Sequence, residues 1–506
     1  MCDSKMPVHE IRTIRAKTTV YLGARAITKM DAIMADLSGR GIGKVLCVTG
    51  RGSYRSTGAW DHVRAAFDRY GVDHVLYDRI TPNPTVDSVD EAVEMGRDFG
   101  AQAVVAIGGG SPIDAAKSAA ILLQYPDRDA RDLYELRFVP DRAVPVVAVN
   151  LTHGTGTEAD RFAVVSLPEK DYKPAIAYDC IYPAYAIDDP ALMTGLSADQ
   201  TRFVSIDALN HVIEAATSKA ASPYTVLLAR ETARLVAAYL PQALAHPGDL
   251  TARYHLLYAS LIAGIAFDNG LLHFTHALEH PLSAVRPDLA HGLGLSMILP
   301  AVIAQIYPAC PEVLTSLLAP FVEDLKGLPA ESERAARAME RWLASVGVPD
   351  KLEDQGLRRG RHRPPDGSGH DDALPRRPSG HGPHSGAEGD GGGHLPPLPQ
   401  TLQPLREVTS ETGPLPDRRG VETRETALPE GRSLVSAYRQ ARKDTDRASR
   451  SLPIDPQVRV RGQRFALPVA SPGRTDDAPD RFSPADRESL ASEPFLGRGE
   501  PSCECG

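Results

Sequence analysis

Four histidines interrupt the apolar stretch LLHFTHALEHPLSAVRPDLAHGLGLSMILP, which covers residues 271–300. His273, His276 and His280 recur at offsets of three and four residues, so on a helix they project from one face. His291 follows further along the same stretch. A single histidine in a helix is usually an ordinary core or surface residue, but a cluster of imidazoles is typical of a divalent metal site. The stretch therefore indicates metal binding.

A second segment, SIDALNHVIEAATS at 205–218, adds further donors. Asp207 and His211 lie four residues apart, so a helix presents both on one face, with Glu214 on nearly the same face. One carboxylate and up to four imidazoles suit Fe(II), Zn(II) or a similar divalent ion, and these donor types do not select among the ions. The spacing leaves open which of the four histidines are ligands.

A glycine-rich turn, AIGGGSPIDAAKSAA at 106–120, follows an apolar run and opens a helical one. Three consecutive glycines let the backbone approach a pyrophosphate, and a helix N-terminus supplies free N–H groups and the positive end of a dipole. Ser111 is a candidate cap, while Asp114 and Lys117 place charge near the turn. We predict an anion cradle, with an ordinary strand-to-helix turn as the alternative. The pattern G-x-G-x-x-G is absent, so the binding mode differs from the common dinucleotide fingerprint.

A polar loop, NLTHGTGTEAD at 150–160, follows the apolar run at 144–150. A loop at the carboxyl end of a parallel strand lies where α/β proteins bind ligands. Its threonine hydroxyls fit contacts with a nicotinamide or a ribose. A surface turn rich in small residues is the alternative.

The elements that must position these residues divide the chain into domains. Over residues 1–195, short β-branched runs alternate with helical stretches, which predicts an α/β domain with a mostly parallel sheet. Residues 196–355 carry long Ala- and Leu-rich segments and predict an all-α domain. The clearest strands are expected at 44–50, 74–78, 103–110 and 144–150, with crossover helices at 57–71 and 85–100.

Near residue 355 the composition changes abruptly, and Gly, Pro, Arg and His dominate residues 356–506 without any period. We predict that this low-complexity tail is disordered. The change falls within the helical domain, which favours translation of a shifted reading frame after about residue 357 over a natural tail. A helical pattern in another frame of the coding DNA would support the shift, and its absence would refute it.

The composition excludes two classes of binding partner. The chain has 506 residues, 42% of them hydrophobic, and a net charge of -9 with acidic and basic residues interspersed. It therefore offers no basic stripe for nucleic acid and no polybasic patch for a membrane. No run approaches the roughly 20 apolar residues of a membrane span, and the N-terminus does not resemble a signal peptide, so we expect a cytoplasmic protein. Six scattered cysteines predict free thiols, and the terminal CECG is only a weak metal motif.

Six motifs together resemble those of the iron-dependent, group III alcohol dehydrogenases. They are, in chain order, TPNPTVDSV, GGGSPIDAAK, GTGTE, IDALNHVIEA, AGIAFDNGLLHFTHALEHPLSA and HGLGLSMILP. The resemblance covers residues 1 to about 355. It implies an N-terminal dinucleotide-binding α/β domain followed by an all-helical domain, with cofactor and metal between them.

The resemblance also implies roles for single residues. The metal ligands that it implies are Asp207, His211, His276 and His291. His280 becomes a near-site residue that contacts substrate or relays a proton, whereas His273 matches no ligand position. The implied cofactor-binding residues are Gly50, Gly108, Gly109, Gly110, Ser111, Asp114, Thr152, Thr155 and Lys173.

Two departures from the family concern the cofactor. The family loop often reads Pro-Thr-Thr-Ala-Gly-Thr-Gly-Ser-Glu, and this chain differs from it at Asn150, Leu151, His153 and Thr157. After the strand expected at 44–50, many members carry an aspartate that accepts the ribose 2′-hydroxyl, but this chain has Gly50 followed by Arg51. Loss of the carboxylate removes repulsion of a 2′-phosphate and an arginine binds one, so NADP is favoured slightly over NAD.

The activity that the resemblance implies is reversible oxidation of a small alcohol to an aldehyde or ketone, with hydride transfer to NADP or NAD. Fe(II), with Zn(II) as the alternative ion, would lower the pKa of the substrate hydroxyl. The family commonly forms homo-oligomers. Two alternatives remain at this point: a lyase resembling dehydroquinate synthase, and an inactive product whose altered C-terminus prevents folding.

Overall fold

The structure is a computed structural model that describes residue 9 and residues 11–357, 459–460 and 463–464. The elements from β1 to α13 belong to one compact unit, and the short antiparallel strands β9 (Arg459–Val460) and β10 (Gln463–Arg464) belong to a second. Apart from these strands and the first two residues, the predicted tail at 356–506 lies outside the described residues. Among the described cysteines, Cys47, Cys180 and Cys310 are free thiols.

A six-stranded sheet forms the N-terminal part, and every pair of neighbouring strands in it is parallel. The strand order is β1-β8-β5-β4-β2-β3. The strands are rich in Val, Ile and Ala because a parallel sheet is covered by helices on both faces. Their bounds are β1 (Thr19–Leu22), β2 (Lys44–Gly50), β3 (Asp73–Ile80), β4 (Ala103–Gly108), β5 (Val146–Asn150) and β8 (Tyr185–Asp188).

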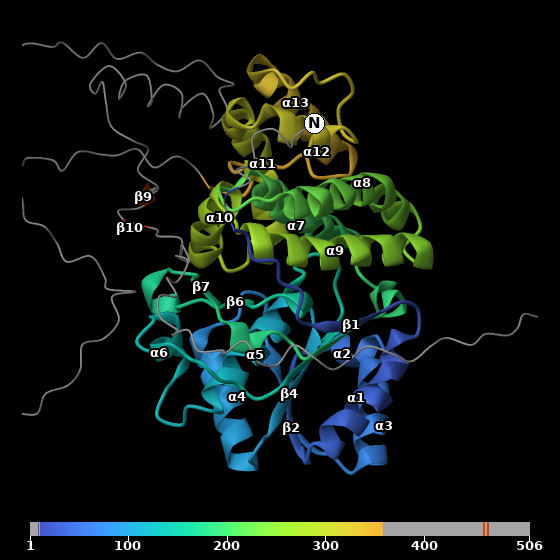
Figure 1. Cartoon of the computed structure of the whole chain (residues 1–506), viewed down its shortest axis with the longest axis vertical. Helices are drawn as coiled ribbons and strands as arrows, with labels where there is room; N and C mark the ends of the chain where they lie inside the picture. Colours follow the sequence, from blue (N-terminus) through green and yellow to red (C-terminus); the bar gives the residue numbers. More distant parts are fainter. Residues whose placement is uncertain (1–8, 10, 358–458, 461–462, 465–506) are drawn as a thin grey trace, which may run out of the picture. The chain divides into compact units, whose positions relative to one another are not determined.

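Helices cover both faces of this sheet (Figure 1). Alternate side chains of β2 divide between two hydrophobic clusters, because Val45 and Cys47 point to one face and Leu46 and Val48 to the other. The helices on the first face are α1 (Met30–Gly39), α2 (Ser53–Ser56) and α3 (Ala59–Tyr70). Those on the second face are α4 (Val86–Phe99), α5 (Gly110–Leu122) and α6 (Ala130–Tyr134).

Short elements complete the connections. An antiparallel pair, β6 (Phe162–Val164) with β7 (Ala175–Ala177), lies between β5 and β8 in the chain. The 3₁₀ helices are η2 (Ala26–Lys29), η3 (Thr157–Ala159), η4 (Pro168–Lys170), η5 (Asp179–Ile181), η6 (Pro190–Met193), η7 (Tyr307–Ala309) and η8 (Pro329–Glu331).

Between β8 and residue 345, every regular element of the described residues is a helix. Three of its helices begin at side-chain caps, because Ser197, Ser222 and Asp249 each accept a hydrogen bond from a first-turn N–H group. The helices are α7 (Ala198–Thr217), α8 (Pro223–Ala245), α9 (Leu250–Gly270), α10 (Phe274–Val285), α11 (His291–Ile306), α12 (Pro311–Leu318) and α13 (Ser332–Ser345).

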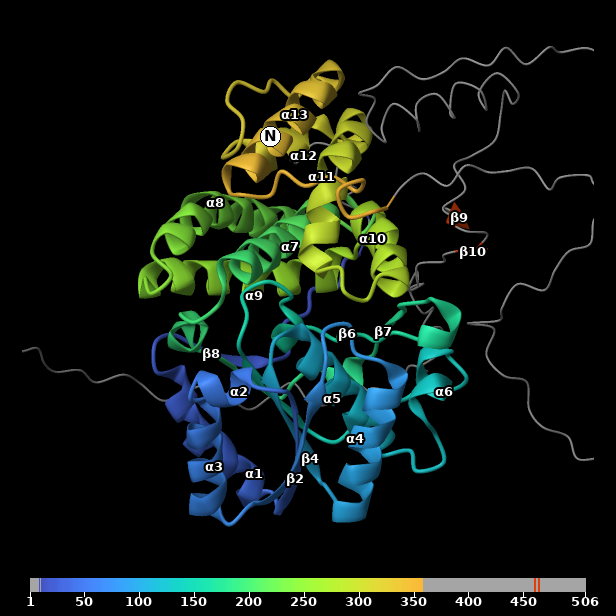
Figure 2. The same cartoon turned by 180° about the vertical axis from the view of Figure 1, so that it is seen from behind.

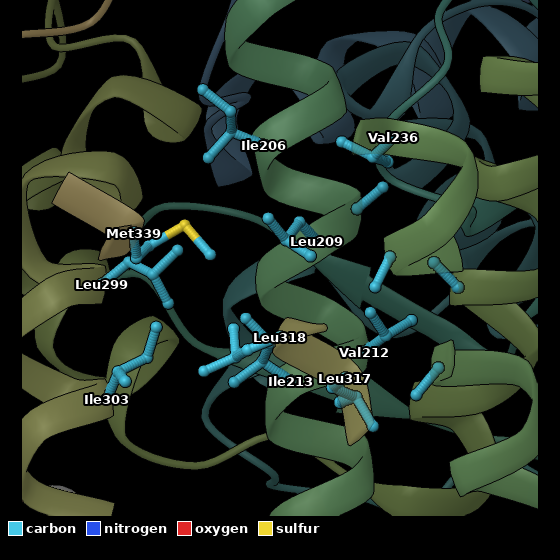
Figure 3. Packing of buried hydrophobic residues seen from close by; sticks show 14 of the residues in the cluster. Ile206, Leu209, Val212, Ile213, Val236, Leu299, Ile303, Leu317, Leu318 and Met339 are labelled. Carbon is cyan, nitrogen blue, oxygen red and sulfur yellow. The ribbon is translucent and has the colours of Figure 1, made fainter. Parts of the chain in front are cut away.

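Helix α7 runs through the middle of this helical core and packs against α8, α9 and α11. Its Leu209, Val212 and Ile213 are fully buried, among side chains such as Val236 and Leu299 (Figure 3). Burying such a side chain contributes about 1.5–3 kcal/mol. The helix that carries Asp207 and His211 is therefore held firmly in place.

Two segments of this core, Leu250–Gly270 and His291–Ala309, are long and apolar enough to cross a membrane by length and composition alone. In each of them 67% of the most apolar stretch is buried inside the protein, as expected of core helices in a folded domain. The prediction that no run approaches this length is therefore wrong for these two segments.

Candidate metal centre and cofactor loops

Three imidazoles surround one carboxylate oxygen of Asp207. Oδ1 of Asp207 lies 3.4 Å from Nε2 of His276, 3.5 Å from Nε2 of His211 and 3.9 Å from Nε2 of His291. Asp207 and His211 come from α7, while α10 and the first residue of α11 supply the other two rings. The three helices pack side by side (Figure 2). Ligands at about 2.0–2.2 Å from a tetrahedral ion stand about 3.3–3.6 Å apart, so the two shorter distances match a single metal site and the distance to His291 is slightly longer.

The polar atoms at this point fit a cation. Oδ1 of Asp207 and Nε2 of His276 are buried and have no hydrogen-bond partner among the described residues. A buried polar atom without a partner costs free energy, and a divalent ion at the centre would satisfy both atoms. The donor atoms of Asp207, His276 and His291 all lie within 4.8 Å of one another, as an oxygen and nitrogen set suited to iron or zinc. His211, the fourth ligand that the resemblance implies, lies outside this group, with its Nε2 3.5 Å from Asp207.

Two buried carboxylates orient the imidazoles. Oε1 of Glu214 lies 2.6 Å from Nδ1 of His276, and Oε2 of Glu279 bonds Nδ1 of His291. Each bond leaves Nε2 of the ring free to face Asp207, as in metal sites where a carboxylate holds the far nitrogen of a ligating histidine. The sequence placed Glu214 near the ligands without a role and missed Glu279. The sequence signal for Glu279 was a carboxylate immediately before His280 in an apolar helix.

Burial and the mutual contacts shift the pKa values of the cluster. Burial by itself raises the pKa of Asp207, but the three imidazoles outweigh it and the pKa lies below its usual value. Burial lowers the pKa of His211 to about 4. Burial also opposes the charge on His276, yet Glu214 and Asp207 raise its pKa to about 10. The cluster therefore attracts a proton when no ion is bound, and a metal must compete with that proton.

His280 and His273 lie on different sides of α10. The ring centroid of His280 is 5.6 Å from that of His291, and burial followed by the charge of Lys173 lowers the pKa of His280. Its ring thus lies beside the candidate metal ligands, where its surroundings favour the neutral form. His273 is the N-cap of α10 and its Nε2 bonds Thr217, so the expected common face holds for His276 and His280 only.

The glycine turn and the threonine loop leave neighbouring strand ends, because Gly108 of β4 pairs with Asn150 of β5. Gly109 caps α5, which begins at Gly110. A Cβ atom on Gly109 would lie 2.7 Å from the side chain of Thr152, and one on Gly110 would lie 2.7 Å from that of Thr155. Only glycine fits beneath the two threonines, so both predicted cofactor segments meet at the N-terminus of α5.

Asp114 and Lys117 of α5 bond the threonine loop and hold it in place. The carboxylate of Asp114 accepts hydrogen bonds from the hydroxyl of Thr157 and from the N–H of Val164. The buried Nζ of Lys117 lies 2.9 Å from Oδ1 of Asp160. Both oxygens of Asp114, a predicted cofactor residue, are thus occupied by protein donors, and the structure gives it a positioning role. Ser111, in the first turn of α5, remains half-buried beside the glycine turn.

The other two predicted cofactor residues lie at the borders of the site. Gly50 ends β2 at the carboxyl edge of the sheet, and the following Arg51 is exposed. Lys173 is buried, donates from Nζ to Oδ1 of Asn83 at 2.8 Å, and lies close enough to Glu279 to lower its pKa. Lys173 is therefore placed on the metal side of the site.

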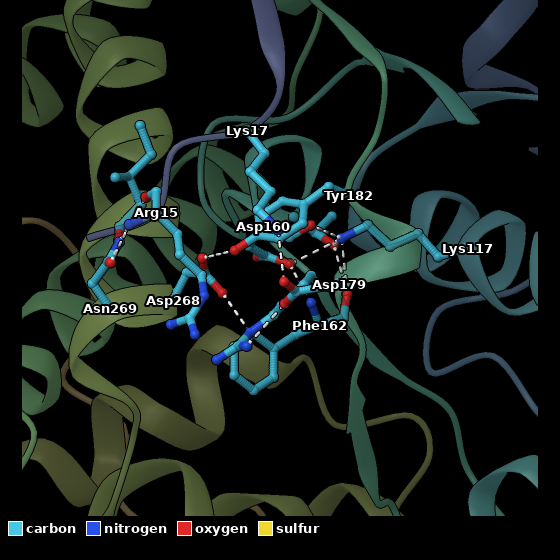
Figure 4. A network of polar contacts seen from close by, with 12 residues as sticks. Arg15, Lys17, Lys117, Asp160, Phe162, Asp179, Tyr182, Asp268 and Asn269 are labelled. Atoms are coloured by element: carbon cyan, nitrogen blue, oxygen red, sulfur yellow. Dashed lines mark hydrogen bonds and ion pairs between the residues drawn. The ribbon is translucent and has the colours of Figure 1, made fainter. Parts of the chain in front are cut away.

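A polar network fixes the end of α9, which leads into α10 (Figure 4). Asp268 bonds the hydroxyl of Tyr182 and pairs with Nε of Arg161 at 3.1 Å. The next residue, Asn269, exchanges two hydrogen bonds with the backbone of Arg15. The sheet part and the N-terminal segment thereby hold the helix that precedes His276 and His280.

Comparison with known proteins agrees with this site. Residues 17–190 match the family described as iron-containing alcohol dehydrogenase, and residues 202–364 match its C-terminal family. A long-chain primary alcohol dehydrogenase of Thermoanaerobacter ethanolicus is 58% identical over 357 residues, which are 71% of this chain and 90% of that protein. The chain belongs to the iron-containing alcohol dehydrogenase family. The family predicted from the motifs is confirmed.

Other family members extend the comparison. The 1,3-propanediol dehydrogenase of Citrobacter freundii is 33% identical over 67% of this chain and 87% of its own length. The crystal structure of an NADH-dependent butanol dehydrogenase from Thermotoga maritima superposes with a TM-score of 0.63 and 28% identity, over 69% of this chain and 87% of that one. The fold predicted for the chain is confirmed. The chain is a nicotinamide-dependent oxidoreductase of the iron-containing alcohol dehydrogenase family.

Proposed function

We propose that this enzyme interconverts primary alcohols and aldehydes with a nicotinamide cofactor, at a metal held by Asp207, His211, His276 and His291. The observation that carries this proposal is the convergence of one Asp207 oxygen with three imidazole nitrogens at 3.4–3.9 Å. When bound, iron or zinc supplies a Lewis acid that lowers the pKa of the substrate hydroxyl.

The residues of the chain perform the remaining tasks. The glycine turn at 108–110 binds the pyrophosphate of the cofactor with backbone N–H groups at the start of α5. Thr152 and Thr155, which lie against that turn, hold the nicotinamide end toward the metal ligands. His280, neutral because of burial and the charge of Lys173, accepts the hydroxyl proton and passes it toward solvent.

We propose primary alcohols with long alkyl chains as the substrate class. The relative from Thermoanaerobacter ethanolicus, at 58% identity, is named for long-chain primary alcohols. The ring of Phe267 stacks against the ligand His211 at 4.6 Å, and Phe162 lies 5.4 Å from Phe267, which supports an apolar border to the site. In a series from ethanol to octanol, kcat/KM should rise with chain length, and a flat or falling series would refute this class.

For the cofactor we propose a modest preference for NADP over NAD. The support is Gly50 at the end of β2, with the exposed Arg51 after it, because the pair removes a carboxylate and offers a guanidinium to a 2′-phosphate. Initial rates with the two cofactors at equal concentration test this. A strong preference for NAD would refute the argument from Gly50.

The deciding experiment follows nicotinamide absorbance in protein loaded with Fe(II) or Zn(II), with primary alcohols and aldehydes as substrates. Turnover in both directions is expected. No nicotinamide change with any alcohol would favour the lyase alternative if circular dichroism shows a folded protein and metal analysis shows bound metal, and an inactive product if they do not. We further propose that the enzyme acts in the cytoplasm as a homo-oligomer, which cell fractionation and size-exclusion chromatography test.

A further inference from the structure

We propose that His153 is a positioning residue that fixes the threonine loop of the cofactor site to the helix carrying Asp207, an inference that rests on the proposed dehydrogenase function. His153 is fully buried. It follows Thr152, whose side chain lies over Gly109 of the glycine turn. Its own ring lies instead between α7 and α9 and makes one hydrogen bond to each helix.

The partners of His153 determine its tautomer. Nε2 lies 2.9 Å from Nη1 of Arg253, and a guanidinium only donates, so Nε2 accepts. The proton of the neutral ring therefore resides on Nδ1, which donates to Oγ of Ser205 at 3.3 Å. Burial and the charge of Arg253 lower the pKa of His153 to about 3, in keeping with a ring that stays neutral.

Arg253 is an unusual partner because it is fully buried and pairs with no carboxylate among the described residues. Its Nη1 also donates to Thr201 at 2.8 Å and its Nε donates to the carbonyl of Pro247 at 3.0 Å. Its Nη2 has no acceptor within the described part of the chain. Without His153, this buried cation loses one of its few acceptors, so the ring and the guanidinium hold each other in place.

The backbone beside His153 fits closely against the same two helices. A Cβ atom on Gly154 would lie 2.4 Å from the carbonyl oxygen of Val204 in α7, and one on Gly156 would lie 2.4 Å from Cα of Gly264 in α9. Ser205, the acceptor for the His153 ring, stands two residues before Asp207. One side chain thus links the loop that faces the cofactor with the helix that supplies the first metal ligand.

This link sets the distance between nicotinamide and metal. Hydride transfer depends steeply on the separation and alignment of the reacting groups, so a displaced loop lowers kcat even when cofactor and substrate still bind. The family loop often has alanine at this position, so a small side chain is compatible with the loop backbone itself. The histidine is therefore a feature of this chain and not a requirement for forming the turn.

The test compares His153→Ala with His153→Gln. His153→Ala should lower kcat about tenfold or more and raise the dissociation constant of the cofactor, measured by nicotinamide fluorescence without substrate, while metal content stays unchanged. His153→Gln should retain kcat within about threefold, because its amide oxygen accepts from Arg253 and its amide nitrogen donates to Ser205.

Thr232→Val is the matched control, since the buried Thr232 hydroxyl bonds the carbonyl of Ala259 between α8 and α9 and does not touch the loop. It should lower Tm with little change in kcat. Unchanged kcat and cofactor affinity in His153→Ala, or an equal kinetic loss in Thr232→Val, would overturn the proposal. If the unaltered enzyme turns over no alcohol, the proposed function fails instead, and the cofactor titration alone then decides the role of His153.

Discussion

Oε1 of Glu214 lies 2.6 Å from Nδ1 of His276, on the side of the ring opposite the nitrogen that faces Asp207. The same oxygen accepts the backbone N–H of His276 at 3.1 Å. Glu214 is fully buried, and the contacts with His276 and with His273 lower its pKa to about 2 despite the opposing effect of burial. A buried carboxylate with a lowered pKa therefore fixes the position and orientation of a candidate metal ligand.

From this contact we predict that Glu214→Ala weakens metal binding about 10- to 100-fold, as found when the carboxylate behind a ligating histidine is removed. Competition with a chromogenic chelator measures the dissociation constant for Zn(II). Glu214→Gln keeps an acceptor for the ring and should lose less affinity than alanine. Equal affinity in Glu214→Ala and the unaltered protein would contradict the role assigned to this bond.

The second prediction separates His276 from its neighbour His273. His276→Ala removes one of the four atoms that converge on the metal position, so bound metal and turnover should be lost together. His273→Ala, the matched control, removes a ring that bonds Thr217 instead, and should retain most of the metal. Metal analysis of both purified variants checks this. Full activity in a metal-free His276→Ala preparation would contradict the proposed chemistry.

The parts of this site that lie within one helix could be read from the sequence. Asp207 and His211 are four residues apart on an α-helix whose period fixes their common face. The start of α10 could not be read in this way, because His273 leaves the helical conformation and caps the helix with its own side chain. Spacing predicts faces within a helix but not the residue at which the helix begins.

Contacts between distant segments were beyond the sequence. Glu279 and His291 meet because α10 and α11 pack against each other, and Lys117 bonds Asp160 because the threonine loop folds over α5. His153 and Arg253 are separated by 100 residues in the chain. Periodicity and motif spacing hold no information about such pairs, so the sequence named candidate ligands but not the residues that orient them.

The third prediction concerns the close approach of the two cofactor loops. In Gly109→Ala the new methyl group would lie 2.7 Å from the Thr152 side chain, so the loops must separate where the pyrophosphate binds. We expect KM for the cofactor to rise at least tenfold. Gly39→Ala is the control, because Gly39 lies in α1 with open space around it and should gain about 0.5–1 kcal/mol of stability. Steady-state kinetics and thermal unfolding of both variants compare the two effects, and an unchanged KM in Gly109→Ala would contradict the contact.

The last prediction follows from two buried acids, Glu158 in the threonine loop and Asp188 at the end of β8. Burial raises the pKa of Asp188 from its usual 3.8 to about 7, and burial and the charge of Asp188 raise the pKa of Glu158. Asn150 donates to Oδ1 of Asp188 at 3.0 Å, whereas both carboxylate oxygens of Glu158 have no partner among the described residues. These two carboxyls therefore hold more protons in the folded protein than in the unfolded chain between about pH 4 and pH 7.

The sign of the effect follows from this difference. The contribution of these two carboxyls to stability should fall as the pH rises from about 4 through 7. Glu158→Gln removes one of the two acids, so its free energy of unfolding should exceed that of the unaltered protein by about 1–3 kcal/mol at pH 8 and by little at pH 4. Urea unfolding at both pH values measures the difference. Glu94 is exposed, so Glu94→Gln is the control and should change neither value. If Glu158→Gln loses as much stability between pH 4 and pH 8 as the unaltered protein does, the buried pair is not the source of the effect.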